Sequence, residues 1–272
     1  MVVEPKYFQV EEDGPIVIWK FNNPPQNLWN NETGPEFTEI VEEFYNSPNL
    51  HVGIITSAMP DVFIQHFDVS LLVEWAEYIK NLPPSPPVEQ GEPRGIYRCG
   101  PKPVIAAINA PLAGGGLEMA MACDFRFMSR NAWASQAEIN VGILAGGGGT
   151  QRMPRLIGIN KALELQLTGR QVYADEAERI GLITKACDPM QLMPETLSFA
   201  RELASKSPLA VALIKQCIYE GTGMPLRDGL ALESESFWKT LTSDDALQAM
   251  KQYVESGQDV KTFLEKMAEQ NK

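Results

Sequence analysis

The sequence predicts an α/β fold, because short apolar runs that suit strands alternate with segments of helical character. The clearest strand is residues 103–108, an apolar run of the kind that suits a strand buried on both faces. A helix-like run follows at 117–123, and a second strand-like run follows at 124–128. Alternation of strands and helices along a chain is typical of layered α/β domains.

The N-terminal part contains further elements of both kinds. Residues 7–12 and 16–22 read as two strands around a turn. A helix is expected from residue 33 onward, with Phe37, Ile40, Val41 and Phe44 on one apolar face. Residues 51–56 read as another buried strand.

Residues 77–99 contain five prolines and are predicted to be a long surface loop between two helical pieces. This loop has two interpretations, a wall of a binding pocket or a solvated connection.

The C-terminal part is predicted to become entirely helical. Short helices and a strand precede this change, at 160–169, 174–181 and 182–186. Later segments have apolar residues three and four apart, at 197–205, 208–220 and 226–240. We therefore expect a core of residues 1–204 and a helical region of residues 205–272. Wide apolar helix faces need a partner surface.

Composition excludes several classes of protein. Of 272 residues, 44% are hydrophobic, so a sizeable core is available, and the formal net charge of −12 argues against a nucleic-acid binder. It also argues against docking on anionic membranes. The sequence shows no signal-peptide pattern and no apolar run long enough to span a membrane. The expected location is cytoplasmic.

Cysteine and histidine usage argues against metal and redox chemistry. The four cysteines lack the close spacing of a metal site or redox motif. Only two histidines, His51 and His66, are present, so we expect no metal site built on several histidines and no Ser-His-Asp triad.

Two glycine runs, each close to an isolated carboxylate, indicate where the chemistry lies. Glycines 114–116 precede Glu118, and glycines 146–149 follow Glu138. Glycine lets the backbone approach a ligand, and a helix start presents unpaired N–H groups to an oxygen that becomes anionic. Either feature alone would suit a turn or a helix-dipole contact. Together they suggest general acid/base chemistry beside an oxyanion site.

The same two stretches resemble a known family. AGGGLEMAMACDF, residues 113–125, is similar to the catalytic-glutamate block of the crotonase (enoyl-CoA hydratase/isomerase) superfamily. QAEINVGILAGGGGTQRMPRLIG, residues 136–158, is similar to the second block of that family. The resemblance extends more weakly from about residue 10 to the C-terminal helices.

The resemblance implies a crotonase-type spiral of ββα units with a C-terminal all-helical region used for trimerisation. It implies catalytic roles for Glu118 and Glu138, with the backbone N–H groups of Phe67 and Gly115 as the oxyanion hole. Gly146 lies where the family positions a water.

The segment at 61–72 resembles the family pattern Phe-x-x-Gly-Ala-Asp, in which Phe63 and Asp68 match. His66 replaces the usual glycine. It is either a loop residue or a side chain that reaches the acyl pocket and alters specificity.

The implied function is an enoyl-CoA hydratase-like lyase that acts on an acyl-CoA thioester. No cofactor is expected, since coenzyme A is part of the substrate, and a homotrimer or a dimer of trimers is expected. A Δ3,Δ2-enoyl-CoA isomerase would need chiefly Glu138. A crotonase-type β-diketone hydrolase and a non-catalytic binding protein are two further hypotheses, although neither protein would be expected to keep both glutamates.

The sequence also departs from the family pattern. Asn23, Pro25 and Ser256 stand where basic residues near CoA are usual, so weaker phosphate contacts are expected. Other basic residues could compensate: Arg94, Lys102, Lys261 and Lys266. Ala137 and Ala145 replace prolines, which changes loop stiffness more than chemistry.

Overall fold

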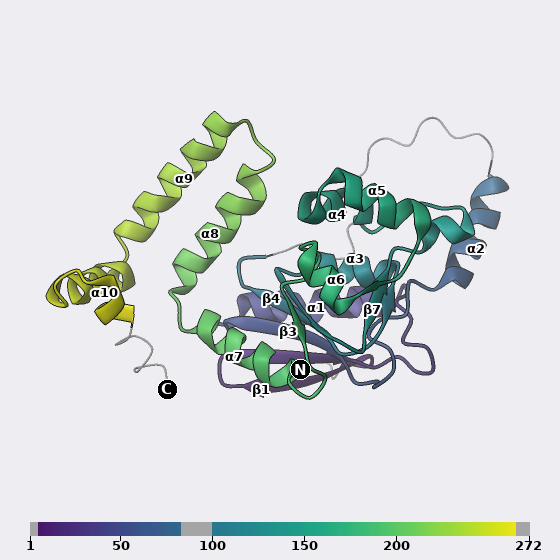
Figure 1. The fold of residues 1–272 in the computed structure, drawn as a ribbon, viewed down its shortest axis with the longest axis horizontal. Helices are drawn as coiled ribbons and strands as arrows, with labels where there is room; N and C mark the ends of the chain where they lie inside the picture. Colours follow the sequence, from purple (N-terminus) through teal and green to yellow (C-terminus); the bar gives the residue numbers. More distant parts are fainter. Residues whose placement is uncertain (1–4, 83–99, 265–272) are drawn as a thin grey trace.

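The computed structural model describes residues 5–82 and 100–264, and they form two sheets surrounded by helices (Figure 1). The larger sheet has the strand order β1-β2-β3-β4-β6-β9, in which β1 and β2 are antiparallel and the later neighbours are parallel. Its strands are β1 (Phe8–Asp13), β2 (Ile16–Phe21), β3 (Val52–Ser57), β4 (Val104–Ile108), β6 (Phe125–Ser129) and β9 (Lys185–Cys187). The α/β prediction is confirmed.

The three-stranded second sheet has the order β5-β7-β8. Its strands are β5 (Leu112–Ala113), β7 (Trp133–Ser135) and β8 (Val172–Tyr173). The sequence did not predict them, because two or three residues are too few to show a periodic pattern.

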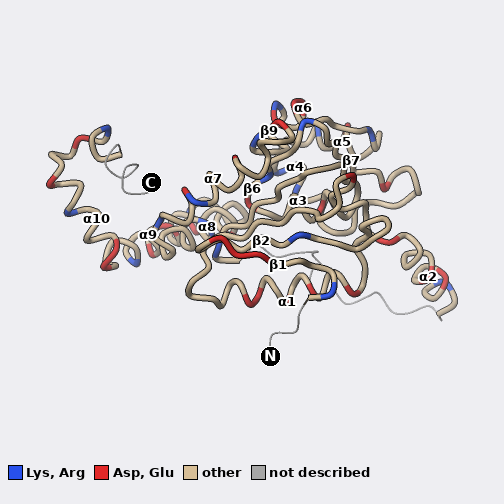
Figure 2. The backbone as a smooth tube through the Cα atoms, turned by 90° about the horizontal axis from the view of Figure 1, so that it is seen from below, with Lys and Arg blue, Asp and Glu red and all other residues tan. Residues whose placement is uncertain are grey.

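The inner strands β2, β3 and β4 of the larger sheet are buried on both faces, whereas the edge strand β1 is mostly exposed. Alternate side chains of β2 enter two separate apolar cores, one with α1 (Thr33–Asn46) and one with α7 (Leu192–Ala204). On the α1 side, the Trp19 ring meets the rings of Phe37 and Phe44 edge to face, with centroids 5.7 and 5.3 Å away. Figure 2 shows α1 and α7 on opposite sides of β1 and β2.

The remaining helices of the body follow β3 along the chain. Helix α3 (Gly115–Ala122) is buried over its whole length, although it contains Glu118. Helices α4 (Gly149–Ile157) and α5 (Ile159–Thr168) pack together beside it. The other elements of this part are α2 (Val69–Lys80), the 3-10 helix η1 (Glu138–Val141) and α6 (Ala174–Arg179).

Several predicted boundaries were wrong. Helix α2 continues to Lys80, so its last turn occupies the start of the loop expected at 77–99, and residues 83–99 lie outside the described residues. Helix α7 begins at Leu192 rather than 197, with Pro194 in its first turn, where a missing N–H costs no helical bond. Strand β9 begins at Lys185, three residues later than the strand expected at 182–186.

The C-terminal helices α8 (Pro208–Gly221), α9 (Leu226–Leu241) and α10 (Asp244–Glu255) extend away from the body (Figure 1). Their large apolar side chains include Phe237 and Trp238, which are 55% and 60% exposed. The helical character of this region is confirmed. The division between residues 204 and 205 and the trimer stay predictions.

A buried ion pair attaches α8 to the body. Lys215 Nζ lies 2.6 Å from Asp124 Oδ2, and the two side chains are only 11% and 6% exposed. The Tyr219 hydroxyl donates to Asp124 Oδ1 at 2.9 Å, and Lys215 also donates to the Lys102 carbonyl. The helical region is therefore joined to the body close to the end of α3.

No helix within residues 5–82 and 100–264 is long and apolar enough to cross a membrane. The cytoplasmic location stays a prediction.

Replacing Lys215 by methionine should lower the free energy of unfolding by about 3 kcal/mol, because Asp124 stays buried after losing its cationic partner. Urea unfolding at fixed protein concentration measures this. The matched control is Lys239→Met, which removes an exposed pair with Glu235 and should cost at most about 0.5 kcal/mol. Equal losses of unfolding free energy in the two variants would contradict the stabilising role of the Lys215–Asp124 pair.

Candidate active site

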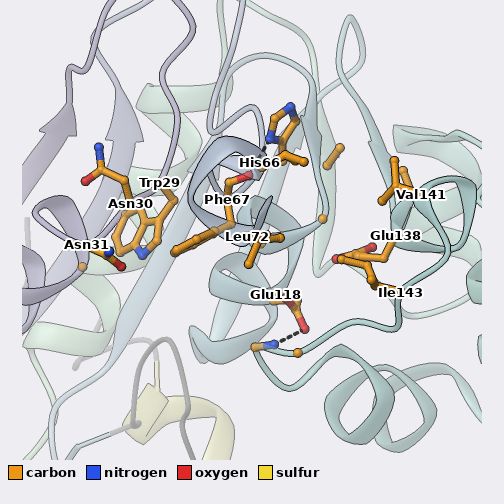
Figure 3. Close-up of a pocket in the computed structure, with 18 of the residues that line it drawn as sticks. Trp29, Asn30, Asn31, His66, Phe67, Leu72, Glu118, Glu138, Val141 and Ile143 are labelled. Atoms are coloured by element: carbon orange, nitrogen blue, oxygen red, sulfur yellow. Dashed lines mark hydrogen bonds between the residues drawn. The ribbon is translucent and has the colours of Figure 1, made fainter. Parts of the chain in front are cut away.

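A cavity of about 770 Å³ opens beside the N-terminal end of α3 (Figure 3). Much of its lining is apolar, from side chains that include Trp29, Leu72, Trp75, Val141 and Ile143. All six site residues predicted from the sequence line this one cavity: His66, Phe67, Gly115, Glu118, Glu138 and Gly146. They come from segments far apart in the chain, so the fold brings together what the sequence separates.

The Phe67 segment is held by a short parallel bridge to Trp29. The N–H of Trp29 donates to the His66 carbonyl at 2.9 Å, and the N–H of Asp68 donates to the Trp29 carbonyl at 2.8 Å. This pattern leaves the N–H of Phe67 outside the bridge. Within the described residues, the N–H groups of Phe67 and Gly115 donate to no backbone carbonyl, and both residues line the cavity. The pair is therefore a suitable oxyanion hole.

The glycine triplet permits this geometry. Gly114 has φ +48°, in the region that favours glycine, and a Cβ there would lie 3.1 Å from Glu138 Oε1. A Cβ on Gly116 would lie 2.3 Å from the Ile64 carbonyl oxygen. The start of α3 can approach the 64–67 segment only because these positions have no side chain.

Glu118 is a buried carboxylate with two backbone donors. Its side chain accepts hydrogen bonds at Oε1 from the N–H groups of Gly147 and Gly149, each at 2.7 Å, and the residue is 3% exposed. Gly149 is the first residue of α4, so this carboxylate lies at a helix N-terminus. Burial raises the pKa of Glu118, with a further rise from Glu138, while the two N–H donors and the Arg152 charge act in the opposite direction.

Glu138 begins η1 and is held less completely. Gln136 Nε2 donates to Glu138 Oε1 at 2.8 Å. Within the described part of the chain, Glu138 Oε2 is buried without a hydrogen-bond partner. Burial raises the pKa of Glu138, while its hydrogen bonds and His66 act in the opposite direction. Burial without a donor at one oxygen favours the protonated form of a carboxyl.

His66 belongs to the loop before α2 and also lines the cavity. Its Nδ1 donates to the Phe67 carbonyl at 2.7 Å, which fixes the imidazole beside the Phe67 peptide. The residue lines the cavity, as the pocket interpretation expected, and its influence on specificity stays a prediction.

The sequence did not identify several residues that support the site. Asn27, at φ +54°, donates through Nδ2 to the Phe63 carbonyl and to Ser57, and its own carbonyl accepts from the N–H of Gln65. It thus holds the segment that leads to Phe67. The donors from Gly147 and Gly149 were missed because the glycine run shows flexibility but not which N–H is used. Gln136 is the first residue of the second family block, but the resemblance implied no role for it.

Lys102, one of the basic residues considered for the CoA phosphates, has another role. Its Nζ donates to the Phe44 carbonyl at 2.7 Å and also to the Ser47 carbonyl. It therefore holds the end of α1. Arg94 and Lys266 lie outside the described residues.

In the described parts of the chain, no three His, Cys, Asp or Glu side chains form a group that could hold a metal ion. The expectation that no cofactor is needed stays a prediction.

Comparisons with known proteins identify the family of this chain. The family model described as enoyl-CoA hydratase/isomerase matches residues 11–262. The chain belongs to the enoyl-CoA hydratase/isomerase family.

Two similar relatives of this family match nearly the whole chain. The short-chain-enoyl-CoA hydratase of Clostridium acetobutylicum is 34% identical over 255 residues, with 90% of this chain and 94% of the relative covered. The crotonyl-CoA hydratase of Syntrophomonas wolfei is 33% identical over 251 residues, with 90% and 94% covered.

A solved structure, the enoyl-CoA hydratase from Bacillus anthracis, matches with a TM-score of 0.79 and 29% identity, covering 92% of this chain and 96% of that chain. The family resemblance and the crotonase-type fold are confirmed. The roles of individual family residues, Glu118, Glu138, Phe67, Gly115 and Gly146, stay predictions.

The raised pKa of Glu138 gives a stability prediction whose sign is fixed. The folded protein binds this proton more tightly than the unfolded chain does, so Glu138 costs stability as pH rises from about 4.3 through its folded-state pKa. Glu138→Gln stays neutral, and its free energy of unfolding relative to the native protein should increase over that pH range. Chemical unfolding at several pH values measures the difference.

The matched control is Glu77→Gln on the exposed surface of α2, which should stay within about 0.5 kcal/mol of the native protein at each pH. If the difference in free energy of unfolding between Glu138→Gln and the native protein does not change with pH, the prediction is wrong.

Proposed function

We propose that the protein is a hydratase that adds water across the 2,3 double bond of an enoyl-CoA thioester. The observation that carries this proposal is the meeting of two carboxyls, the buried Glu118 and the half-buried Glu138, in one apolar cavity that also contains two backbone donors. The names of the relatives support the same substrate class.

The oxyanion hole would act on the thioester carbonyl. As water adds at Cβ, negative charge moves to the thioester oxygen, and the N–H groups of Phe67 and Gly115 would stabilise it. Fixed donors in a water-poor cavity are effective because they need no reorganisation during the reaction. Removing one donor of this kind typically costs about 10²–10³ in rate.

The two carboxyls would divide the proton transfers. Glu118, which has two N–H donors and a nearby arginine, suits the carboxylate that takes a proton from water. Glu138, with one side-chain donor, suits the carboxyl that gives its proton to Cα. A proton must then return from Glu118 to Glu138, and the net result is the addition of one water. Gly146 would help to place that water.

The reaction as proposed needs no metal or separate cofactor, because coenzyme A arrives as part of the substrate. The names of the two relatives specify short-chain enoyl-CoA and crotonyl-CoA, so we propose a short acyl chain here as well. Loss of the conjugated-thioester absorbance of crotonyl-CoA is the direct test, and no loss would contradict the function.

We also propose a homotrimer or a dimer of trimers. The support is the exposed apolar surface of α8, α9 and α10, which one chain leaves uncovered.

Replacing either glutamate by glutamine should remove most hydratase activity, by about 10²–10⁴ each, because the amide keeps the shape but cannot exchange the proton. The double variant should lose much less than the product of the single losses, because both groups act on one water. Steady-state rates with crotonyl-CoA measure this.

A 3-enoyl-CoA provides the second readout. Any isomerase activity should depend on Glu138 much more than on Glu118, since moving one proton needs one base. If Glu118→Gln keeps full hydration, the two-carboxylate mechanism is wrong. Retention of the native fold by circular dichroism is the control.

Sedimentation at micromolar concentration should show a trimer or hexamer. Phe237→Glu, in the exposed apolar face of α9, should shift it toward monomer, because a buried charge at an interface is costly. The control is Met190→Glu on the exposed body surface, which should leave the assembly unchanged. A stable native monomer would refute the oligomer.

A further inference from the structure

Arg152 is a charged residue of α4 that the reaction described above uses only as a charge near Glu118. Its Nη1 donates to the Gly147 carbonyl oxygen at 2.7 Å. The N–H of the same Gly147 donates to Glu118 Oε1 at 2.7 Å. One glycine therefore connects the guanidinium to the carboxylate that the proposed mechanism uses as a base.

The turn at residues 147–149 leaves space for the Arg152 guanidinium. Gly148 has φ +108°, and a Cβ on it would lie 2.1 Å from Arg152 Nη1. The Arg152 backbone N–H also donates to the Gly148 carbonyl at 2.8 Å. Arg152 thus holds the turn through both its side chain and its backbone. Gly149, the second donor to Glu118, is the last residue of this turn.

Within residues 5–82 and 100–264, the charges that act on Glu118 and on its neighbour Glu138 come from three segments. Glu138 of η1 raises the pKa of Glu118, Arg152 of α4 lowers it, and His66 of the loop before α2 acts on Glu138. Burial is the largest influence and favours the neutral acid. The positive charge of Arg152 therefore opposes the influence that would disable a base.

We propose that Arg152 is a positioning residue that fixes the 147–149 turn, so that both N–H donors point at Glu118. Its positive charge also favours the carboxylate form of Glu118. The proposal rests on the function of Glu118 as the base proposed above. Arg152 is not among the residues that line the cavity, so it acts through Glu118 and not on the substrate.

The test is the pH dependence of kcat for crotonyl-CoA hydration by Arg152→Met. A base must be deprotonated, so activity falls as pH falls through its pKa, and loss of the cation should move this fall to higher pH by roughly one unit. At a pH below the fall, kcat should be about tenfold lower. KM should change less than about twofold, because the substrate contacts are kept.

Two further variants separate charge from shape. Arg152→Lys keeps the charge but lacks the planar fork, so its pH profile should stay near the native position while its plateau decreases. Arg155→Met removes an arginine of the same helix that donates to the Gln151 carbonyl at 2.8 Å, and its profile should match the native one. If Arg152→Met does not fold, Arg152→Gln replaces it, with the same expected shift.

Three results would overturn the proposal: an unshifted profile for Arg152→Met, an equal shift for Arg155→Met, or a full shift for Arg152→Lys. The activity of Glu118→Gln distinguishes failure of the positioning role of Arg152 from failure of the proposed mechanism. If that variant is inactive while the Arg152 profiles are unshifted, only the positioning role is wrong. If it is fully active, the assignment of the base is wrong.

Discussion

The structure depends most on the placement of one carboxylate in an apolar interior. Glu118 lies on a helix with no exposed residue, and burial of a charge is costly unless donors compensate. The compensation comes from the backbone of the 147–149 turn, in which glycine is needed for the conformation and for the space. Helices α3 and α4 must therefore keep a fixed relation, and the wall of the cavity follows from it.

A second close approach fixes the opposite wall. The start of α3 lies against the backbone at Ile64, and Asn27 holds the same segment from its other side. Helix α3 is thus fixed between two loops, one with Phe67, the proposed oxyanion donor, and one with the donors to Glu118. Rigid placement of this kind is what electrostatic stabilisation of a developing charge requires, since mobile donors would have to reorganise during the reaction.

Elements with a clear apolar pattern could be predicted from the sequence, and so could six of the residues that line the cavity. The strands β2, β3 and β4 were found as short apolar runs, and the helices α1, α8 and α9 were found from apolar residues three and four positions apart. Strands β5, β7 and β8 were too short, and Pro194 obscured the start of α7. At the site, composition and glycine spacing indicated Glu118 and Glu138. The identity of the donors did not follow, because a glycine run does not show which peptide points where, and the bonds of Asn27 Nδ2 join residues 30 or more positions apart.

The contact between Asp124 and Lys215 also limits how this chain can be recombined with its relatives. A chimaera that exchanges everything after residue 204 keeps this contact only if the new C-terminal part also supplies a lysine and a hydroxyl at the positions of Lys215 and Tyr219. The C-terminal helices are therefore portable only under that condition. Otherwise, a workable exchange would have to transfer Asp124 and its two partners together, and this would place the junction inside the body rather than at the visible boundary between body and tail.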